Sequence, residues 1–125
     1  MRCRNGCNAG NAVAIFHCDD KPTQWTFIEY GAGQIAVKVA NKNICIEGEP
    51  EFNIVTLGSC SASNKNQRFI AEEGDFNGRR FELTPITKRG WCVTQRHHPK
   101  NNEALKLERC ASVRRYSDTS FWNKV

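Results

Sequence analysis

The chain has 125 residues, of which 39% are hydrophobic, and a formal net charge of +5. This length fits one domain, since domains most often have about 100–150 residues, and no segment reaches the roughly 18 apolar residues of a membrane-spanning helix. The first residues lack the apolar core of a signal peptide. Seven cysteines in a small chain are nevertheless typical of an oxidising compartment. We therefore expect a secreted or extracellular protein, whose sequence is a mature segment with an added initiator Met1.

Alternating apolar residues predict strands along the whole chain. A period of two between Gly, Asn, Asp and Ser turns indicates half-buried strands of about four to six residues. No segment has an apolar stripe of helical period with caps, so we expect helix only as single turns. The alternating sets are, in chain order, Val13/Ile15, Ile35/Val37/Val39, Val55/Leu57, Phe81/Leu83 and Leu105/Leu107.

The cysteines mark a repeat of about forty residues, the scale at which repeat architectures are sought. The cysteine-bounded intervals 3–18 and 45–60 have the same length, and GNAVAIFHC of the first aligns with FNIVTLGSC of the second. The interval 92–110 has three more residues, which we assign to the loop RHHPKNN, and its end EALKLERC keeps the apolar spacing. The repeats are expected at 1–42, 43–90 and 91–125.

Three four-stranded units predict an all-β chain that closes around a pseudo-threefold axis as a single β-trefoil domain, which removes exposed sheet edges. A bridge between the first two strands of each unit would contribute about 3 kcal/mol. Cys7 is left over, and it is free, pairs between molecules, or replaces Cys3 as the partner of Cys18. The third unit lacks a clear fourth strand, so we expect either that the barrel closes imperfectly or that the sequence begins late. The expected bridges are Cys3–Cys18, Cys45–Cys60 and Cys92–Cys110.

An aromatic residue follows the second cysteine of each unit, in TQWTF, NQRFI and TSFWN. With the cysteine spacing, these segments resemble the ricin B-type lectin family, whose β-trefoil repeats carry a Q-x-W signature. Asn66-Gln67-Arg68-Phe69 matches the signature with Phe in place of Trp, whereas the segments at Trp25 and Trp122 keep the Trp with Thr and Ser in place of Gln. The resemblance implies carbohydrate binding without a cofactor, and core positions for these aromatic residues.

The resemblance also implies which residues bind the sugar. In this family a carboxylate lies two residues after the first cysteine of a unit, an aromatic platform two before the second cysteine, and an Asn before the signature Gln. The second unit supplies Glu47, Asn66 and Gln67, but Gly58 stands at the platform position. We expect a galactose-type site here, partly degenerate because the platform is missing and Glu is one methylene longer than the expected Asp. Phe52 and Phe76 are the candidates for a replacement platform.

The other two units match less well. The first supplies Phe16 as the platform and Asn5 at the carboxylate position, with Pro22 in place of the Asn. The third has Thr94, Glu108 and Thr119, and matches at none of the three positions.

We expect neither an enzyme nor a metal site, because no nucleophile elbow, phosphate loop or zinc-protease motif occurs and the three histidines do not form a convincing zinc set. We also expect neither nucleic-acid binding nor membrane insertion. The alternative is a secreted β-trefoil that binds a protein or an acidic glycan through basic loops, as an inhibitor, toxin or effector module. Steep salt dependence would identify the acidic glycan. The candidate anion-binding residues are Arg79, Arg80, Lys88, Arg89 and Arg96.

Overall fold

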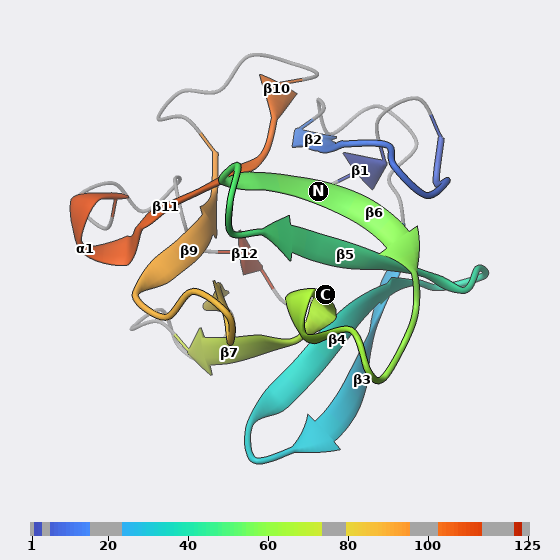
Figure 1. Ribbon diagram of the computed structural model, residues 1–125, viewed down its shortest axis with the longest axis horizontal. Coiled ribbons are helices and arrows are strands. Elements are labelled where there is room, and N and C mark those ends of the chain that lie inside the picture. The colour runs from blue at the N-terminus through green and yellow to red at the C-terminus, as the bar shows by residue number, and fades with distance from the viewer. Residues whose placement is uncertain are drawn as a thin grey trace.

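The structure is a computed structural model that describes residues 2–3, 6–15, 24–73, 80–95, 103–113 and 122–123. These residues form an all-β fold in which helix is limited to one 3-10 turn and one four-residue α-helix (Figure 1). Strands contain all residues of four of the alternating sets, and Leu105 of the fifth set lies between two strands, so the sequence-based prediction of strands is confirmed. Within the described ranges, no helix has the length and apolar character needed to cross a membrane.

The strands are given below by the residue ranges of the three predicted units. In residues 1–42 the strands are β1 (Arg2–Cys3), β2 (Val13–Ile15), β3 (Trp25–Gly31) and β4 (Gln34–Val39). Residues 43–90 contain β5 (Ile44–Glu49), β6 (Ile54–Ser59), the 3-10 turn η1 (Lys65–Gln67), β7 (Phe69–Glu73) and β8 (Arg80–Pro85). Residues 91–125 contain β9 (Trp91–Thr94), β10 (Glu103–Ala104), β11 (Lys106–Arg109), α1 (Cys110–Val113) and β12 (Trp122–Asn123).

The strands form a nearly closed, barrel-like sheet. The larger sheet has nine strands in the order β12-β8-β7-β4-β5-β6-β11-β9, with β3 paired to β4 outside this path. A smaller sheet has the order β1-β2-β10. β8 and β9 lie near opposite ends of the larger path, yet Thr84 Oγ1 and Cys92 Sγ are 3.9 Å apart. The path therefore curves back on itself instead of forming an open, flat sheet.

The second strands of the three predicted units adjoin one another pairwise. An isolated bridge joins the segment before β2 to β6, β6 pairs with β11, and β10 pairs with β2. Equivalent hydrogen bonds recur at aligned positions: Leu57 N donates to Asn11 O at 2.9 Å, and Leu107 N donates to Asn53 O at 2.9 Å. The aligned segments are therefore hydrogen-bonded to one another.

The aligned apolar residues meet in one core. Complete burial of such a side chain stabilises a fold by about 1.5–3 kcal/mol, which makes this cluster the main favourable contribution. Phe69 of the signature is fully buried, as expected, and Trp25 is half-buried against the same cluster. The side chain of Trp122 lies outside the described part of the chain. The most deeply buried members of the cluster are Val13, Val37, Ile46, Val55, Phe69, Leu83, Val93, Leu105 and Leu107.

Two of the three expected disulfides are confirmed. Cys45 bonds to Cys60 and Cys92 to Cys110, with Cα–Cα distances of 5.0 Å and 5.1 Å. The expected Cys3–Cys18 bridge is wrong, because Cys3 bonds to Cys7 at a Cα–Cα distance of 5.0 Å. The left-handed φ of 100° at Gly6, which glycine adopts without strain, turns the chain so that the two cysteines meet. Cys18 lies outside the described residues.

Candidate functional site

The candidate site lies on the outer face of the β5–β6 hairpin. Antiparallel pairing places Glu47 opposite Thr56, and Cys45 opposite Gly58, while Ile46 on the other face points into the core. The loop that follows the hairpin contains η1, which lies next to β5 in Figure 1. The Cys45–Cys60 bridge ties the start of this loop to β5. A strand carboxylate and the amides of a loop are thereby brought together.

The carboxylate of Glu47 is held by two side-chain amides. Its Oε1 accepts hydrogen bonds from Asn64 Nδ2 at 2.9 Å and from Gln67 Nε2 at 2.8 Å. Gln67 is only 1% exposed, and it also donates to Ser59 O at 2.8 Å and accepts from Ser61 N at 2.9 Å. Gln67 therefore positions Glu47 from inside the fold, with its amide already engaged by protein groups.

Asn64 is the site residue that the sequence analysis missed. It caps η1, since its Oδ1 accepts the backbone N–H of Asn66 at 3.0 Å, while its Nδ2 donates to Glu47. An Asn two residues before the Asn-Gln pair is a signal for this role, because Asn side chains commonly accept a backbone N–H two positions on. Asn66 follows in η1 and is half-buried, and its side-chain amide makes no hydrogen bond to the described residues.

Gly58 stands where the resemblance implies an aromatic platform, and the structure shows what occupies that place. A Cβ atom at residue 58 would lie 2.2 Å from Glu47 Oε1, 2.8 Å from its Cδ and 3.2 Å from Gln67 Nε2. The first two distances are far below van der Waals contact, so any side chain here would displace the carboxylate. Gly58 is therefore the residue that leaves room for Glu47 in its present position.

A second carboxylate, Glu49, lies beside Glu47 on the same face of β5. Partial burial raises the pKa of Glu49 above its usual 4.5, helped by a hydrogen bond with Glu47 and by the charges of Glu47 and Glu51, whereas a hydrogen bond from Thr56 lowers it. Thr56 Oγ1 lies 3.5 Å from Glu49 Oε1. The two carboxylates thus interact with each other on this face.

The lysine side chains of the neighbouring strands interact with groups other than Glu47 and Glu49, and the lysine of η1 is exposed to solvent. Lys38 on β4 donates to the carbonyls of Val39 and Ala40, and Lys106 on β11 pairs with Glu108 at 3.2 Å. Lys65 on η1 is exposed.

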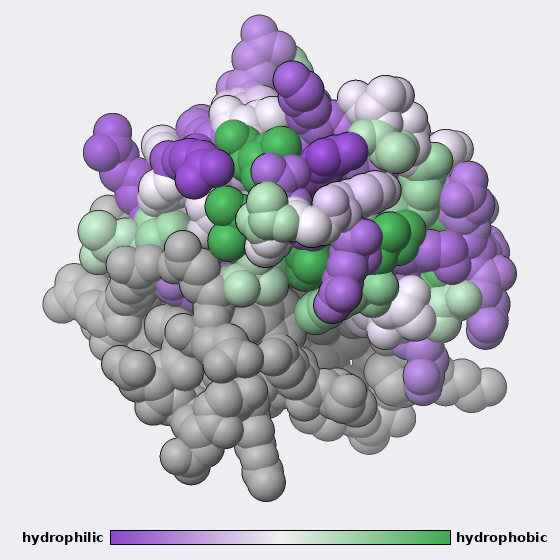
Figure 2. Space-filling view, turned by 90° about the horizontal axis from the view of Figure 1, so that it is seen from below, coloured by the Kyte–Doolittle hydropathy of each residue, from purple (hydrophilic) through white to green (hydrophobic). Residues whose placement is uncertain are grey.

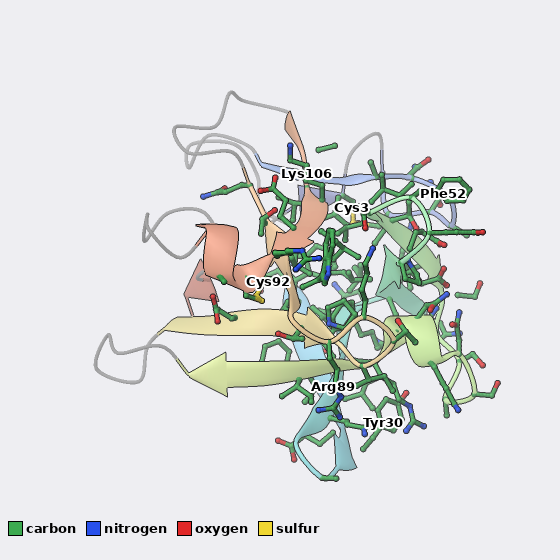
Figure 3. All side chains as sticks on the ribbon, turned by 60° about the vertical axis from the view of Figure 1, so that its left-hand side comes forward. Cys3, Tyr30, Phe52, Arg89, Cys92 and Lys106 are labelled. Carbon is green, nitrogen blue, oxygen red and sulfur yellow. A yellow bond between two sulfur atoms is a disulfide. The ribbon has the colours of Figure 1, made fainter. Side chains whose placement is uncertain are left out.

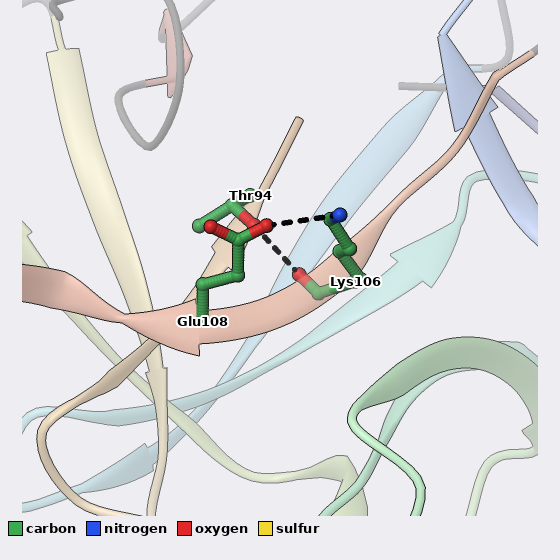
Figure 4. Close-up of polar contacts among 3 residues, drawn as sticks. All are labelled: Thr94, Lys106 and Glu108. Atoms are coloured by element: carbon green, nitrogen blue, oxygen red, sulfur yellow. Dashed lines mark hydrogen bonds and ion pairs between the residues drawn. The ribbon is translucent and has the colours of Figure 1, made fainter. Parts of the chain in front are cut away.

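The equivalent face of the third unit carries a different polar set (Figure 4). Thr94 is buried and donates through Oγ1 to Lys106 O at 3.2 Å, while Lys106 Nζ lies 3.2 Å from Glu108 Oε1. The side chains of this ion pair are substantially exposed. The sequence-based candidates Asn5, Phe16, Pro22, Phe76 and Thr119 lie outside the described residues.

The loop of the candidate site is attached to the first unit by Arg68. Its guanidinium donates to Ala62 O at 2.7 Å and to Gln34 Oε1 at 3.3 Å. The same group lies 4.3 Å from the centroid of the Tyr30 ring, within the range of a cation–π contact.

Phe52, a candidate platform, lies in the turn between β5 and β6 and is 69% exposed at the edge of the molecule (Figure 3). Lys88 anchors this turn: its Nζ donates to Pro50 O at 2.8 Å and to Asn53 Oδ1, and lies 3.9 Å from the centroid of the Trp91 ring. Lys88 is therefore engaged within the fold.

Of the other expected anion-binding residues, Arg89 is exposed. The part of the chain that the structure describes does not include Arg79, Arg96 or the side chain of Arg80. On the face drawn in Figure 2, hydrophilic and smaller apolar groups are interspersed over the described residues. No group of three His, Cys, Asp or Glu residues suited to a metal ion occurs within the described ranges.

No protein-family model and no curated protein matches this sequence. Among solved structures, a chain in the crystal structure of the Haemophilus ducreyi cytolethal distending toxin is similar to it, with a TM-score of 0.63 and 13% sequence identity. The superposition covers 90% of this chain and 76% of that chain. At this identity the similarity shows a shared fold.

Proposed function

We propose that the chain is a carbohydrate-binding β-trefoil module of the ricin B lectin type that works outside the cell. The recurrent pairing of the second strands and the bridges of the second and third units support the trefoil. Three disulfides and the shared fold with a toxin chain support an extracellular location. The toxin similarity also supports a role as the binding module of a toxin or effector.

The arrangement of Glu47, Asn64 and Gln67 is the observation that carries the proposal. A sugar site needs acceptors and donors fixed in place, because a shallow site orients its ligand through a few polar groups. Both amides bond to Oε1 of the carboxylate, and Glu47 also has a hydrogen bond with Glu49, so that the carboxylate is fixed in place as an acceptor for ligand hydroxyl groups. The side-chain amide of Asn66, in the adjacent turn η1, is a further candidate donor and acceptor.

The test is a glycan array at two salt concentrations, followed by titration of the best ligand against variants. Glu47→Ala and Asn66→Ala are expected to weaken binding of a neutral sugar by more than about tenfold, since each removes a direct polar contact. Glu108→Ala is the matched control, because it removes the carboxylate of the third unit and should leave the affinity unchanged. Strong binding that survives both changes in the second unit would contradict this site.

The two salt concentrations separate the proposal from the acidic-glycan alternative. Binding of a neutral sugar should respond little to salt, whereas binding of a sulfated glycan through exposed cations such as Arg89 should fall steeply. An array that gives sulfated glycans alone, with strong salt dependence, would favour the alternative.

A further inference from the structure

We propose that the turn between β5 and β6 is a docking surface for a basic, arginine-containing segment of another protein. Three features of the turn support this assignment: exposed apolar side chains, a backbone fixed by hydrogen bonds, and a local excess of negative charge. The surface lies apart from the candidate carbohydrate site and would serve a different partner.

The turn concentrates exposed apolar surface. Among the described residues three large apolar side chains are exposed, and two of them, Phe52 and Ile54, lie two residues apart in this turn and at the start of β6. Phe52 is the more exposed of the two and lies at the edge of the molecule (Figure 3). Aromatic residues are enriched at the centre of protein–protein interfaces, where they become buried on binding. Phe52 is therefore placed to act as the anchor of an interface.

Hydrogen bonds hold the turn in one conformation before a partner arrives. The backbone N–H groups of Phe52 and Asn53 both donate to Glu49 O, at 3.2 Å and 2.8 Å. From two neighbouring segments, Leu107 N donates to Asn53 O at 2.9 Å and Lys88 Nζ donates to Asn53 Oδ1. A fixed anchor loses little conformational entropy on association, which favours affinity.

The charges around the turn indicate the kind of partner. Residues 44–59 contain three Glu and no Lys or Arg, although the net charge of the chain is +5. Glu51 follows Pro50 in the turn, adjoins Phe52 and is exposed. Burial raises the pKa of Glu49, and the charges of neighbouring carboxylates, Glu51 among them, raise it further. The turn therefore attracts a segment that carries cations and repels an acidic one.

The lysines beside the turn are occupied by other groups. Lys106, on the strand that pairs with the start of β6, forms an ion pair with Glu108 at 3.2 Å. Lys88 donates to two oxygen atoms of the turn itself, neither of which belongs to a carboxylate. Among the described residues, no Lys or Arg forms an ion pair with Glu49 or Glu51. These two carboxylates can therefore meet the cations of a partner.

Arginine is the cation that matches both the ring and the charge of the turn. Its planar guanidinium stacks on an aromatic face and forms paired hydrogen bonds with a carboxylate, whereas the ammonium group of lysine is a point charge. The fold already contains one such stack, since the Arg68 guanidinium lies 4.3 Å from the centroid of the Tyr30 ring. At the turn, Phe52 offers an exposed ring next to Glu51 in the sequence. A partner arginine is expected to occupy this position.

The turn is distant from the candidate carbohydrate site. Ile54 is four residues from Gly58 along β6, about 13 Å at 3.3 Å per residue. The side-chain oxygen of Asn53, a possible partner for a sugar hydroxyl group, accepts a hydrogen bond from Lys88 instead. The turn thus presents an apolar ring and negative charge, a combination that suits a basic protein segment better than a neutral sugar.

The experiment selects binders to the full chain from a displayed library of random peptides and repeats the selection with Phe52→Ser. We expect the peptides recovered with the unchanged chain alone to contain more Arg than the library does. A synthetic copy of the most frequent peptide is then titrated by calorimetry. Phe52→Ser and Glu51→Gln should each weaken its binding, Phe52→Ser by more than about tenfold, and the affinity should fall as salt is added.

Two controls exclude trivial causes. Glu29→Gln removes an exposed carboxylate on β3, outside the hairpin, and should leave the affinity for the peptide unchanged. Thermal unfolding of Phe52→Ser should match that of the unchanged chain, because substitution of an exposed side chain seldom alters stability.

Three results would overturn the assignment. The first is that the recovered peptides bind Phe52→Ser equally well or show no excess of Arg. The second is self-association of the chain that depends on Phe52 in sedimentation, because the occupant would then be another copy. The third is loss of glycan binding in Phe52→Ser, which would place Phe52 in the carbohydrate site while the proposed function stands. A negative glycan array, in contrast, would overturn the proposed function and leave the docking surface untouched.

Discussion

The β5–β6 and β9–β11 hairpins have the same construction but carry their carboxylates on different strands. Each is bridged from its first strand to the residue after its second, by Cys45–Cys60 and Cys92–Cys110. In the first hairpin Glu47 on the leading strand lies opposite Thr56, and glycine lies opposite the cysteine. In the second, Thr94 lies opposite Lys106, and Glu108 lies opposite the cysteine.

The different positions of Glu47 and Glu108 in their hairpins determine which groups each carboxylate contacts. Glu47 reaches across Gly58 toward the loop amides, which are neutral donors. Glu108 is paired with Lys106 on its own strand. The comparison shows that a common scaffold supports a candidate binding site in one hairpin and a surface ion pair in the other.

The largest expected effect tests whether the disulfides of the two hairpins stabilise the fold equally. Replacing both cysteines of either bridge by Ser should lower the free energy of unfolding by about 3 kcal/mol, because the closed loops of 15 and 18 residues are similar in length. Urea denaturation of the two double variants measures both losses. A loss below about 1 kcal/mol at only one bridge would show that the hairpins differ in more than their surface residues.

The next effect tests the role of glycine in the first hairpin. Gly58→Ala should lower the free energy of unfolding by about 1–3 kcal/mol, since the added methyl group overlaps the Glu47 carboxylate. Glu108→Ala at the equivalent place should cost no more than about 1 kcal/mol, because the exposed ion pair that it removes contributes little. Equal losses in denaturant titrations would mean that Gly58 is not required for the position of Glu47.

A smaller effect is expected at Asn64. Asn64→Ala should cost about 1 kcal/mol, the usual contribution of an N-cap, and it also removes one donor from Glu47. Asn64→Asp keeps the capping oxygen but places a second negative charge beside Glu47. Thermal unfolding at several pH values measures both variants. The stability of Asn64→Asp relative to that of Asn64→Ala should be lower at neutral pH than at acid pH. Identical pH profiles for the two variants would contradict the Asn64–Glu47 contact.

The smallest effect is a pH dependence of stability that arises from Glu49 in the first hairpin. The pKa of Glu49 is raised in the folded state above 4.5, so the folded chain holds more protons than the unfolded chain between these two values. The contribution of Glu49 to stability is complete below pH 4.5 and is lost as the pH rises through the folded pKa. Glu49→Gln should flatten this decrease in urea midpoints, and an unchanged slope would refute it.

The strands were predictable because their cause is local in sequence. Period-two alternation places Val55 and Leu57 on one face, and burial of that face fixes the register, since a slip by one residue would expose both. The shared spacing of the cysteines likewise predicted the Cys45–Cys60 bridge. The position of the first bridge depends instead on the turn at Gly6, which a comparison of intervals does not detect.

The candidate site was predictable in part. Glu47 and Gln67 were identified through the resemblance, and the structure brings them into contact at 2.8 Å. The capping role of Asn64 depends on the conformation of the loop, and the position of the Glu47 carboxylate depends on space left by a missing side chain. In the family pattern, Gly58 marks the loss of the aromatic platform. In the structure, the absence of a side chain at Gly58 leaves space for the Glu47 carboxylate.

The contacts of Arg68 limit how the candidate site can be moved to another protein or duplicated during evolution. Its bonds to Gln34 and its contact with Tyr30 fasten the loop of the second unit to the β3–β4 hairpin of the first. A peptide that contained residues 43–90 alone would keep Glu47, Asn64 and Gln67 but lose this external support. The geometry of the candidate site therefore depends on the β3–β4 hairpin as well as on residues 43–90, and duplicating that segment by itself would copy its residues without this support.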